Sequence, residues 1–221
     1  MAALWELLQI RRGVTAVIGS GGKTSLLARL ARELTAQGAV ILCTTTRVCV
    51  PEDFPVCDPT EEELPSLLAE QRVLFAGAPA EHGKLCAPRL SIAVLARAAD
   101  YVLVEADGAK RLPIKAHAAH EPAIPAESGN VICVVGCEGF GKPLSAVCHR
   151  PEMFTKLTGC AEDALLTPEL AAKAAEAEAL SDRYYLNQAE GREDLARRFA
   201  AAVTRPTVMG SLQEGWFLCL R

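Results

Sequence analysis

The stretch Val14–Leu27 constrains the fold of this chain more than any other. It reads V-T-A-V-I-G-S-G-G-K-T-S-L-L, so a short apolar run meets a glycine-rich turn and a helical pattern begins behind it. Glycines allow positive φ and bring backbone N–H groups close to phosphate oxygens, while a helix N-terminus supplies further free N–H groups. The order strand, glycine loop, helix therefore predicts a phosphate-binding loop.

Each residue of this loop has a predicted task. Lys23 would reach the β- and γ-phosphates of ATP or GTP, and the Thr24 hydroxyl would hold Mg²⁺. The strict motif has glycine where this chain has Val17, and the short form resembles the compact loops of Mur ligases and of some cofactor-assembly NTPases. The alternative is a glycine turn without a ligand. The predicted nucleotide-binding loop residues are Gly19, Ser20, Gly21, Gly22, Lys23, Thr24 and Ser25.

Composition limits the class of protein. The chain has 221 residues, half of them hydrophobic and 23% charged, which predicts a single folded domain over residues 1–221, with 151–181 as a possible helical appendage. A net charge of −4 does not favour nucleic acid as a partner. We expect no membrane partner and a cytoplasmic location, because apolar runs are short and Arg11 and Arg12 follow the first apolar residues, the reverse of a signal peptide.

Apolar periodicity predicts alternating strands and helices. This pattern indicates an α/β fold, P-loop NTPase-like, with a mainly parallel sheet and helices on both faces. The expected strands are 14–18, 39–43, 73–76, 101–104, 130–135, 183–186, 207–208 and 216–220. The expected helices are 2–10, 24–37, 61–70, 88–99, 167–180 and 190–203.

Hydroxyl groups and a guanidinium follow the second expected strand. In parallel sheets, ligands gather at the carboxyl ends of the strands. This run is therefore expected to meet a phosphate, Mg²⁺ or a bound water, although threonines that simply continue the strand are the alternative. Its members are Thr44, Thr45, Thr46 and Arg47.

Two carboxylates follow the strand expected at 101–104. Glu105 comes directly after the apolar run and Asp107 two residues later, so both can point the same way in an extended chain. A strand that ends in an acid is what a metal-side carboxylate requires. We expect one of them to organise Mg²⁺ and the other to orient the attacking group, and the sequence leaves open which is which. Helix-capping acids in a loop are the alternative.

Basic residues follow these acids closely. Lys110, Arg111 and Lys115 are candidates for binding an anionic substrate or neutralising a transferring phosphoryl group, with a proline-stiffened surface crossover as the alternative. His117 and His120 lie three residues apart, but the surrounding prolines argue against a helix that would bring them together as metal ligands. A rigid substrate loop fits this segment better.

The block after the strand at 183–186 reads N-Q-A-E, where GTPases place N-K-x-D. Asn187 is therefore a candidate for contact with the base or the ribose, and an N-cap of the next helix is the alternative.

Nine cysteines at irregular spacing indicate mostly reduced, buried thiols. Cys148 stands directly beside His149.

Several segments together resemble the YqeC family, accessory proteins of selenium-dependent molybdenum hydroxylases. The most specific is V-E-A-D-G-A-K-R-L-P-I-K, and residue 117 is His where the family pattern is expected to have Pro. The segments that carry the resemblance are 17–27, 44–47, 104–115, 120–125 and 149–154. The resemblance implies a phosphate-loop NTPase-like protein that helps to make or load a selenium-containing or molybdenum cofactor. Selenium handling through a cysteine is a further hypothesis, for which Cys148, beside His149, is the candidate thiol.

Three readings of function follow. In the first, Mg²⁺ with ATP or GTP binds the loop, and hydrolysis or phosphoryl activation drives a step in maturation of the hydroxylase or its cofactor. In the second, the protein is a nucleotide-gated carrier or chaperone with little turnover, whose partners are the hydroxylase or its cofactor-loading proteins. The third is a Mur-like ligase or small-molecule kinase, although 221 residues leave little room for the extra domains of such ligases.

Overall fold

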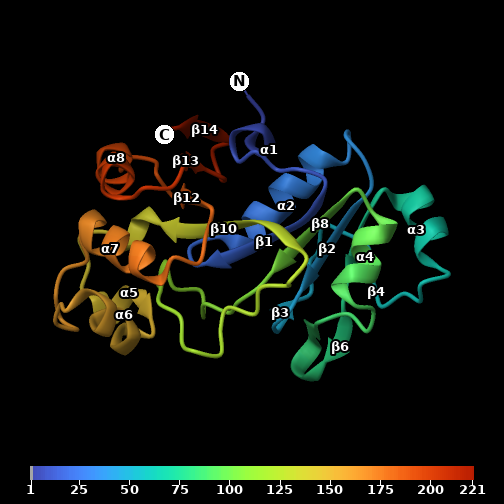
Figure 1. Cartoon of the computed structure of the whole chain (residues 1–221), viewed down its shortest axis with the longest axis horizontal. Helices are drawn as coiled ribbons and strands as arrows, with labels where there is room; N and C mark the ends of the chain where they lie inside the picture. The colour runs from blue at the N-terminus through green and yellow to red at the C-terminus, as the bar shows by residue number, and fades with distance from the viewer. Residues whose placement is uncertain (1) are drawn as a thin grey trace.

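Across residues 2–221, which the computed structural model describes, nine strands form one sheet in the order β14-β13-β12-β10-β1-β8-β2-β5-β4. All neighbours pair in parallel except β13 and β14 (Figure 1). The strands are β1 (Gly13–Gly19), β2 (Val40–Thr44), β4 (Val56–Cys57), β5 (Val73–Ala76), β8 (Tyr101–Glu105), β10 (Ser128–Gly136), β12 (Arg183–Asn187), β13 (Thr207–Ser211) and β14 (Trp216–Cys219).

The central strands are buried on both faces. In β8, Tyr101 and Leu103 pack into the apolar cluster on one face, whereas Val102 and Val104 pack into the cluster on the other. Helices cover both faces of a parallel sheet, so its strands read as continuous apolar runs rather than as alternating ones. This explains why the run before Glu105 is apolar without interruption.

Helices pack on both faces of the sheet. The face with α1 and α2 shares one apolar cluster, and α3, α4, α6, α7 and α8 pack on the opposite face. In Figure 1, α3 and α4 lie toward one end of the sheet and α6, α7 and α8 toward the other. The helices are α1 (Leu4–Leu7), α2 (Lys23–Leu34), α3 (Leu64–Gln71), α4 (Ile92–Ala98), α5 (Leu144–Val147), α6 (Pro151–Thr158), α7 (Pro168–Glu178) and α8 (Glu193–Ala202).

Small elements complete the chain. Three short strands form a second sheet in the order β3-β7-β6, and β11 pairs in parallel with β9. These elements are β3 (Val48–Cys49), β6 (Ala78–Ala80), β7 (Lys84–Cys86), β9 (Ile114–Lys115), β11 (Cys148–His149) and the 3₁₀ turns η1 (Glu81–Gly83) and η2 (Cys137–Gly139). Strands β6 and β7 pair antiparallel as a hairpin.

The predicted α/β class, with a mainly parallel sheet flanked by helices, is confirmed.

The helix expected at 24–37 begins at Lys23 and ends at Leu34, and residues 35–37 form a turn instead. Gly38 is needed for close packing, since a Cβ atom there would lie 2.2 Å from a carboxylate oxygen of Asp100. The helix expected at 88–99 begins only at Ile92, where the Ser91 hydroxyl caps it by accepting the Val94 N–H.

Residues 151–181 share a core with the sheet. Phe154 of α6 and Ala171 of α7 are buried in one cluster with Val135 of β10 and Tyr184 of β12. These helices therefore pack directly on β10, which pairs with β1, and on the next strand, β12. Within residues 2–221, every helix is too short or too polar to cross a lipid bilayer.

Candidate phosphate-loop site

The glycine loop joins the central strand β1 to the helix α2. Gly19, Gly21 and Gly22 have φ of +87°, +91° and +119°, the region that side chains disfavour. A Cβ atom at Gly21 would lie 2.5 Å from the Cα atom of Gly136, so this position also admits no side chain. Gly22 is the N-cap of α2 and no side chain caps that end, which leaves the first N–H groups of the helix free for an anion.

Lys23 is buried at the base of this loop. Its side chain is 5% exposed, and its Nζ atom donates to the Gly19 carbonyl oxygen at 2.8 Å. The same atom lies 2.9 Å from Asp107 Oδ1 and 3.8 Å from Glu105 Oε1. The ammonium group is therefore held beneath the loop by two carboxylates that also compensate its charge.

Thr24 meets the end of the neighbouring strand. Glu105 is the last residue of β8 and lies in register with Val17 of β1, so β8 brings its carboxylate beside the loop. Thr24 is exposed, and its hydroxyl donates to Glu105 Oε2 at 2.9 Å. Burial raises the pKa of Glu105, against the opposing effects of Lys23 and the Thr24 hydrogen bond. A hydroxyl and a carboxylate at one accessible point are hard oxygen donors that fit Mg²⁺.

Asp107 has a different position from Glu105. It is fully buried, and its Oδ2 atom accepts the Gly19 N–H at 2.8 Å. Its other oxygen faces Lys23. Burial favours a higher pKa for Asp107, but the hydrogen bond with His117 and the charges of Lys23 and Lys115 lower it below its ordinary value. The two carboxylates therefore have different surroundings, because Glu105 lies beside Thr24, whereas Asp107 accepts the Gly19 N–H and faces Lys23 beneath the loop.

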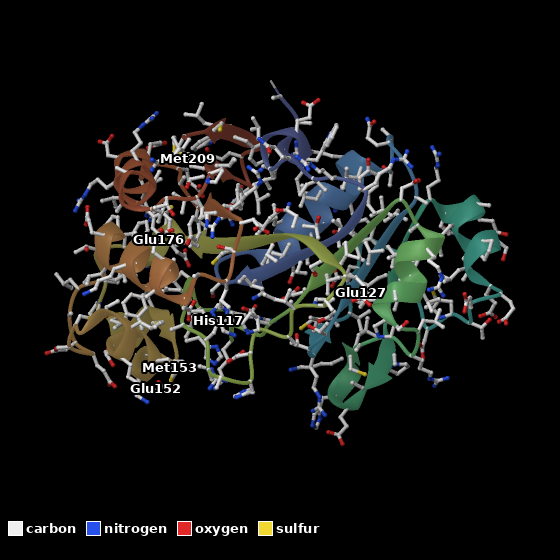
Figure 2. The ribbon with its side chains drawn as sticks, viewed as in Figure 1. His117, Glu127, Glu152, Met153, Glu176 and Met209 are labelled. Atoms are coloured by element: carbon white, nitrogen blue, oxygen red, sulfur yellow. The ribbon has the colours of Figure 1, made fainter. Side chains whose placement is uncertain are left out.

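His117 connects this carboxylate to a helix far along the chain. Its Nε2 atom lies 2.7 Å from Asp107 Oδ2, and its Nδ1 atom lies 2.8 Å from Oε2 of Glu178, the last residue of α7. The backbone N–H of His117 also donates to Glu178 Oε1 at 2.6 Å. Figure 2 shows His117 on the side of the molecule where α6 and α7 lie. The sequence did not indicate this link, because Glu178 ends an alanine-rich helix with no local sign of a site.

The three basic residues after the acids have separate positions. Lys115 has no exposed side-chain surface, and its Nζ atom lies 2.5 Å from Glu121 Oε2, 2.5 Å from the Gly108 carbonyl and 3.6 Å from Asp107 Oδ2. Lys115 is therefore a buried counter-ion rather than a group at the surface. Lys110 and Arg111 are exposed, with φ of 48° and 61°, and they remain candidates for contact with an anion.

The run Thr44–Arg47 fastens the end of β2 to β8. Thr44 Oγ1 donates to the Glu105 carbonyl oxygen at 2.9 Å and accepts the Thr46 N–H at 3.0 Å, and the Thr45 N–H donates to the same carbonyl at 3.0 Å. Arg47 is exposed and lies 3.8 Å from Glu81. These threonines therefore position Glu105, and Arg47 alone extends from the run into solvent.

Two further predicted loop residues differ in exposure. Ser20 is buried, and its hydroxyl donates to the Leu112 carbonyl oxygen, which ties the loop to the segment after the acids. Ser25 is exposed on the first turn of α2. Ser20 thus supports the loop from behind, and Ser25 is accessible to a ligand.

Asn187 supports the loop rather than facing outward. It is 6% exposed, and its side-chain amide donates to the Gly21 carbonyl oxygen at 2.8 Å. Its Oδ1 atom accepts the Leu212 N–H at 3.3 Å. The end of β12 therefore does approach the phosphate loop, but the amide is turned toward the loop backbone, which does not favour the predicted contact with a base or ribose.

The thiol singled out for selenium handling is also buried. Cys148 is 2% exposed, and burial raises its pKa to about 12. A thiol with so high a pKa stays protonated at neutral pH, and the thiolate is the reactive form. This position argues against Cys148 as a nucleophile.

Comparisons with known proteins agree with the resemblance. The family model described as YqeC protein matches residues 15–152, which include the glycine loop, both acids and Lys115 but neither Glu178 nor Asn187. The chain is also similar to a protein of Escherichia coli (strain K12) named Uncharacterized protein YqeC, with 38% identity over 167 residues. That match covers 72% of this chain and 65% of the length of the relative. The chain belongs to the YqeC family.

Proposed function

We propose that this protein is a P-loop NTPase-like protein that binds ATP or GTP with Mg²⁺ at the loop Gly19–Thr24. The observation that carries the proposal is the meeting of three features at one edge of the sheet. They are a glycine loop that opens a helix, a buried lysine at its base, and the hydrogen bond between the Thr24 hydroxyl and Glu105. Each feature serves a Mg²⁺–polyphosphate, and a simple structural turn needs none of them.

The residues of this chain would divide the work between phosphate and metal. The free N–H groups at the start of α2 and the Lys23 ammonium attract the phosphate oxygens. Thr24 and Glu105 would hold Mg²⁺, which when bound neutralises charge on the terminal phosphates. Asp107 keeps Lys23 and the Gly19 N–H in place before a ligand arrives. Preorganisation of this kind is the main way in which phosphate loops act on bound nucleotides.

Hydrolysis or phosphoryl activation is the activity that this site supports best. Three exposed cations, Arg47, Lys110 and Arg111, extend from the segments that follow β2 and β8, the strands beside the Mg²⁺ end. Such cations stabilise charge on a terminal phosphoryl group. A nucleotide-gated carrier with little turnover uses the same residues. Nucleotide turnover measured with and without a partner protein separates the two, because rapid turnover by the isolated protein favours the enzyme.

The biological role implied by the family resemblance stays a prediction. It places this nucleotide site in the maturation of a selenium-dependent molybdenum hydroxylase or its cofactor. The alternative function for the same loop is that of a Mur-like ligase or a small-molecule kinase.

Isothermal titration with ATP and GTP, each with Mg²⁺, tests the proposal. We expect wild type to bind at least one nucleotide with micromolar affinity, Lys23→Ala to lose that binding, and Lys156→Ala, at an exposed position of α6, to retain it. Circular dichroism of each variant shows whether it is folded. No binding by wild type, or equal binding by folded Lys23→Ala, refutes the proposal.

A further inference from the structure

A cavity of about 290 Å³ opens beside the metal end of the phosphate loop. We propose that it binds a second small ligand, an uncharged or cationic molecule with an apolar ring. Its relation to the nucleotide rests on the proposed function. The cavity lies between α2 and the segment 48–54 and reaches β2 and β5 through Leu42 and Phe75.

The walls of the cavity favour a ring system. Apolar side chains from separate segments line it, among them Leu27 of α2, Leu42 of β2, and Val48 and Phe54 of the segment after β2. Phe54 is half-buried, and the guanidinium of Arg32 lies 5.7 Å from its ring centre, which holds this ring against α2. Small-molecule sites typically combine apolar and aromatic walls with a few polar groups, and a volume near 300 Å³ is at the lower end of their range.

The charges of the cavity select against an anion. Its lining contains the carboxylates Glu52, Asp53 and Glu105, and no lysine, arginine or histidine among the described residues that line it. Asp53 is paired with Arg32 at 2.6 Å and Glu105 lies 3.8 Å from Lys23, so Glu52 is the lining carboxylate that has no ion-pair partner among the described residues. A phosphate group or a carboxylate would meet repulsion here, whereas an amine or a neutral ring would not.

The position of the cavity relates it to the terminal phosphate. Thr24, Ser25 and Glu105 form its polar end, and these are the residues beside the Mg²⁺ position proposed above. In the proposed function, the Thr24 hydroxyl and Glu105 would hold Mg²⁺ near the terminal phosphates. A ligand in the cavity would therefore lie next to the terminal phosphate. Asn187 ends β12, which lies on the other side of β1 from β8, so it is not part of this end of the loop.

Three naphthalene probes of different charge test this inference. They are 1-naphthylmethylamine, 1-naphthalenemethanol and 1-naphthoate, and the readout is alkylation of Cys49 by iodoacetamide, followed by mass spectrometry. Cys49 is exposed and lines the cavity, and the exposed Cys219, on the edge strand β14, is the internal control. We expect the amine and the alcohol to protect Cys49, the naphthoate to give little protection, and Cys219 to react equally in every case.

A cavity-filling variant sharpens the test. Val50 lines the cavity and is 47% exposed, so Val50→Trp fills space from a surface loop, and Val56→Trp, at a 37% exposed position outside the lining, is the matched control. Titration with the amine should show about tenfold weaker affinity, or more, in Val50→Trp and no change in Val56→Trp. Equal binding of naphthoate, or unchanged affinity in Val50→Trp, overturns the inference.

Titration of Val50→Trp with Mg²⁺ and ATP or GTP separates this inference from the proposed function. Retained nucleotide affinity supports a separate ligand, whereas loss of affinity places the nucleotide itself in the cavity and overturns the inference. If wild type binds the amine but neither nucleotide, the proposed function fails and the cavity stands. If it binds a nucleotide and none of the probes, the inference fails alone.

Discussion

The buried pair of Lys23 and Asp107 leads to a quantitative prediction about stability. Lys23→Met keeps the length of the side chain and removes its charge. Asp107 is fully buried, and its Oδ1 atom, 2.9 Å from Lys23 Nζ, has no hydrogen-bond partner among the described residues. Breaking a buried ion pair by removing one partner costs about 3–5 kcal/mol. Because the Gly19 N–H, His117 and Lys115 still compensate Asp107, we expect the lower end, about 3 kcal/mol.

Urea unfolding without nucleotide, followed by circular dichroism at pH 7, measures this cost. With an m value of about 3 kcal/mol per molar urea, Lys23→Met should lower the unfolding midpoint by about 1 M. Lys156→Met, at an exposed position of α6, should change the free energy of unfolding by less than about 0.5 kcal/mol.

The double variant Lys23→Met/Asp107→Asn isolates the interaction. The second substitution removes the uncompensated charge. The loss in free energy of unfolding of the double variant should therefore be smaller than the sum of the two single losses by at least about 1 kcal/mol. Additive losses, or a Lys23→Met variant as stable as wild type, would refute the reasoning that this lysine is a buried counter-ion in the free protein.

Two further predictions concern the supports of the loop. Burial lowers the pKa of His117, but its hydrogen bonds with Asp107 and Glu178 raise it above the ordinary 6.5. This stabilisation is fully present below about pH 6.5 and is lost as pH rises through the raised pKa. The difference in melting temperature between wild type and His117→Gln should therefore shrink with rising pH. A difference that stays constant with pH contradicts this prediction. Asn187→Ala leaves the Gly21 carbonyl unpaired and should weaken nucleotide binding about tenfold in titrations; unchanged affinity contradicts the supporting role.

The sequence predicted the parts of the site that are local. The run from β1 through Lys23 into α2 lies within a few residues, and its strand and helix patterns are strong. The strand before Glu105 was equally clear, since it is apolar throughout and ends in an acid. The carboxyl ends of parallel strands meet at one edge of a sheet, so the approach of Glu105 to the loop was predictable as well.

The remaining parts depend on the orientation of side chains, which local patterns do not encode. Glu105 and Asp107 look equivalent in sequence, and only the path of the chain after β8 turns one carboxylate toward Thr24 and the other beneath the loop. Asn187 follows its strand as expected, but its amide faces the loop because the Gly21 carbonyl lies within reach. Lys115 was expected to meet an anion, and the partly buried Glu121 instead provides a nearby counter-charge.

The contacts of Asp107 bear on how Lys23 could stay beneath the loop and still interact with a bound phosphate. A buried carboxylate paired with Lys23 alone would be left uncompensated when phosphate attracts the ammonium group, and that cost would weaken binding. Here Asp107 also accepts the Gly19 N–H at 2.8 Å, lies 2.7 Å from His117 and is 3.6 Å from Lys115. These contacts keep the carboxylate compensated while Lys23 is shared with phosphate. The buried charges behind the loop would therefore lower the cost of the proposed nucleotide binding, and Lys115 and His117, from the segment directly after the acids, contribute two of them.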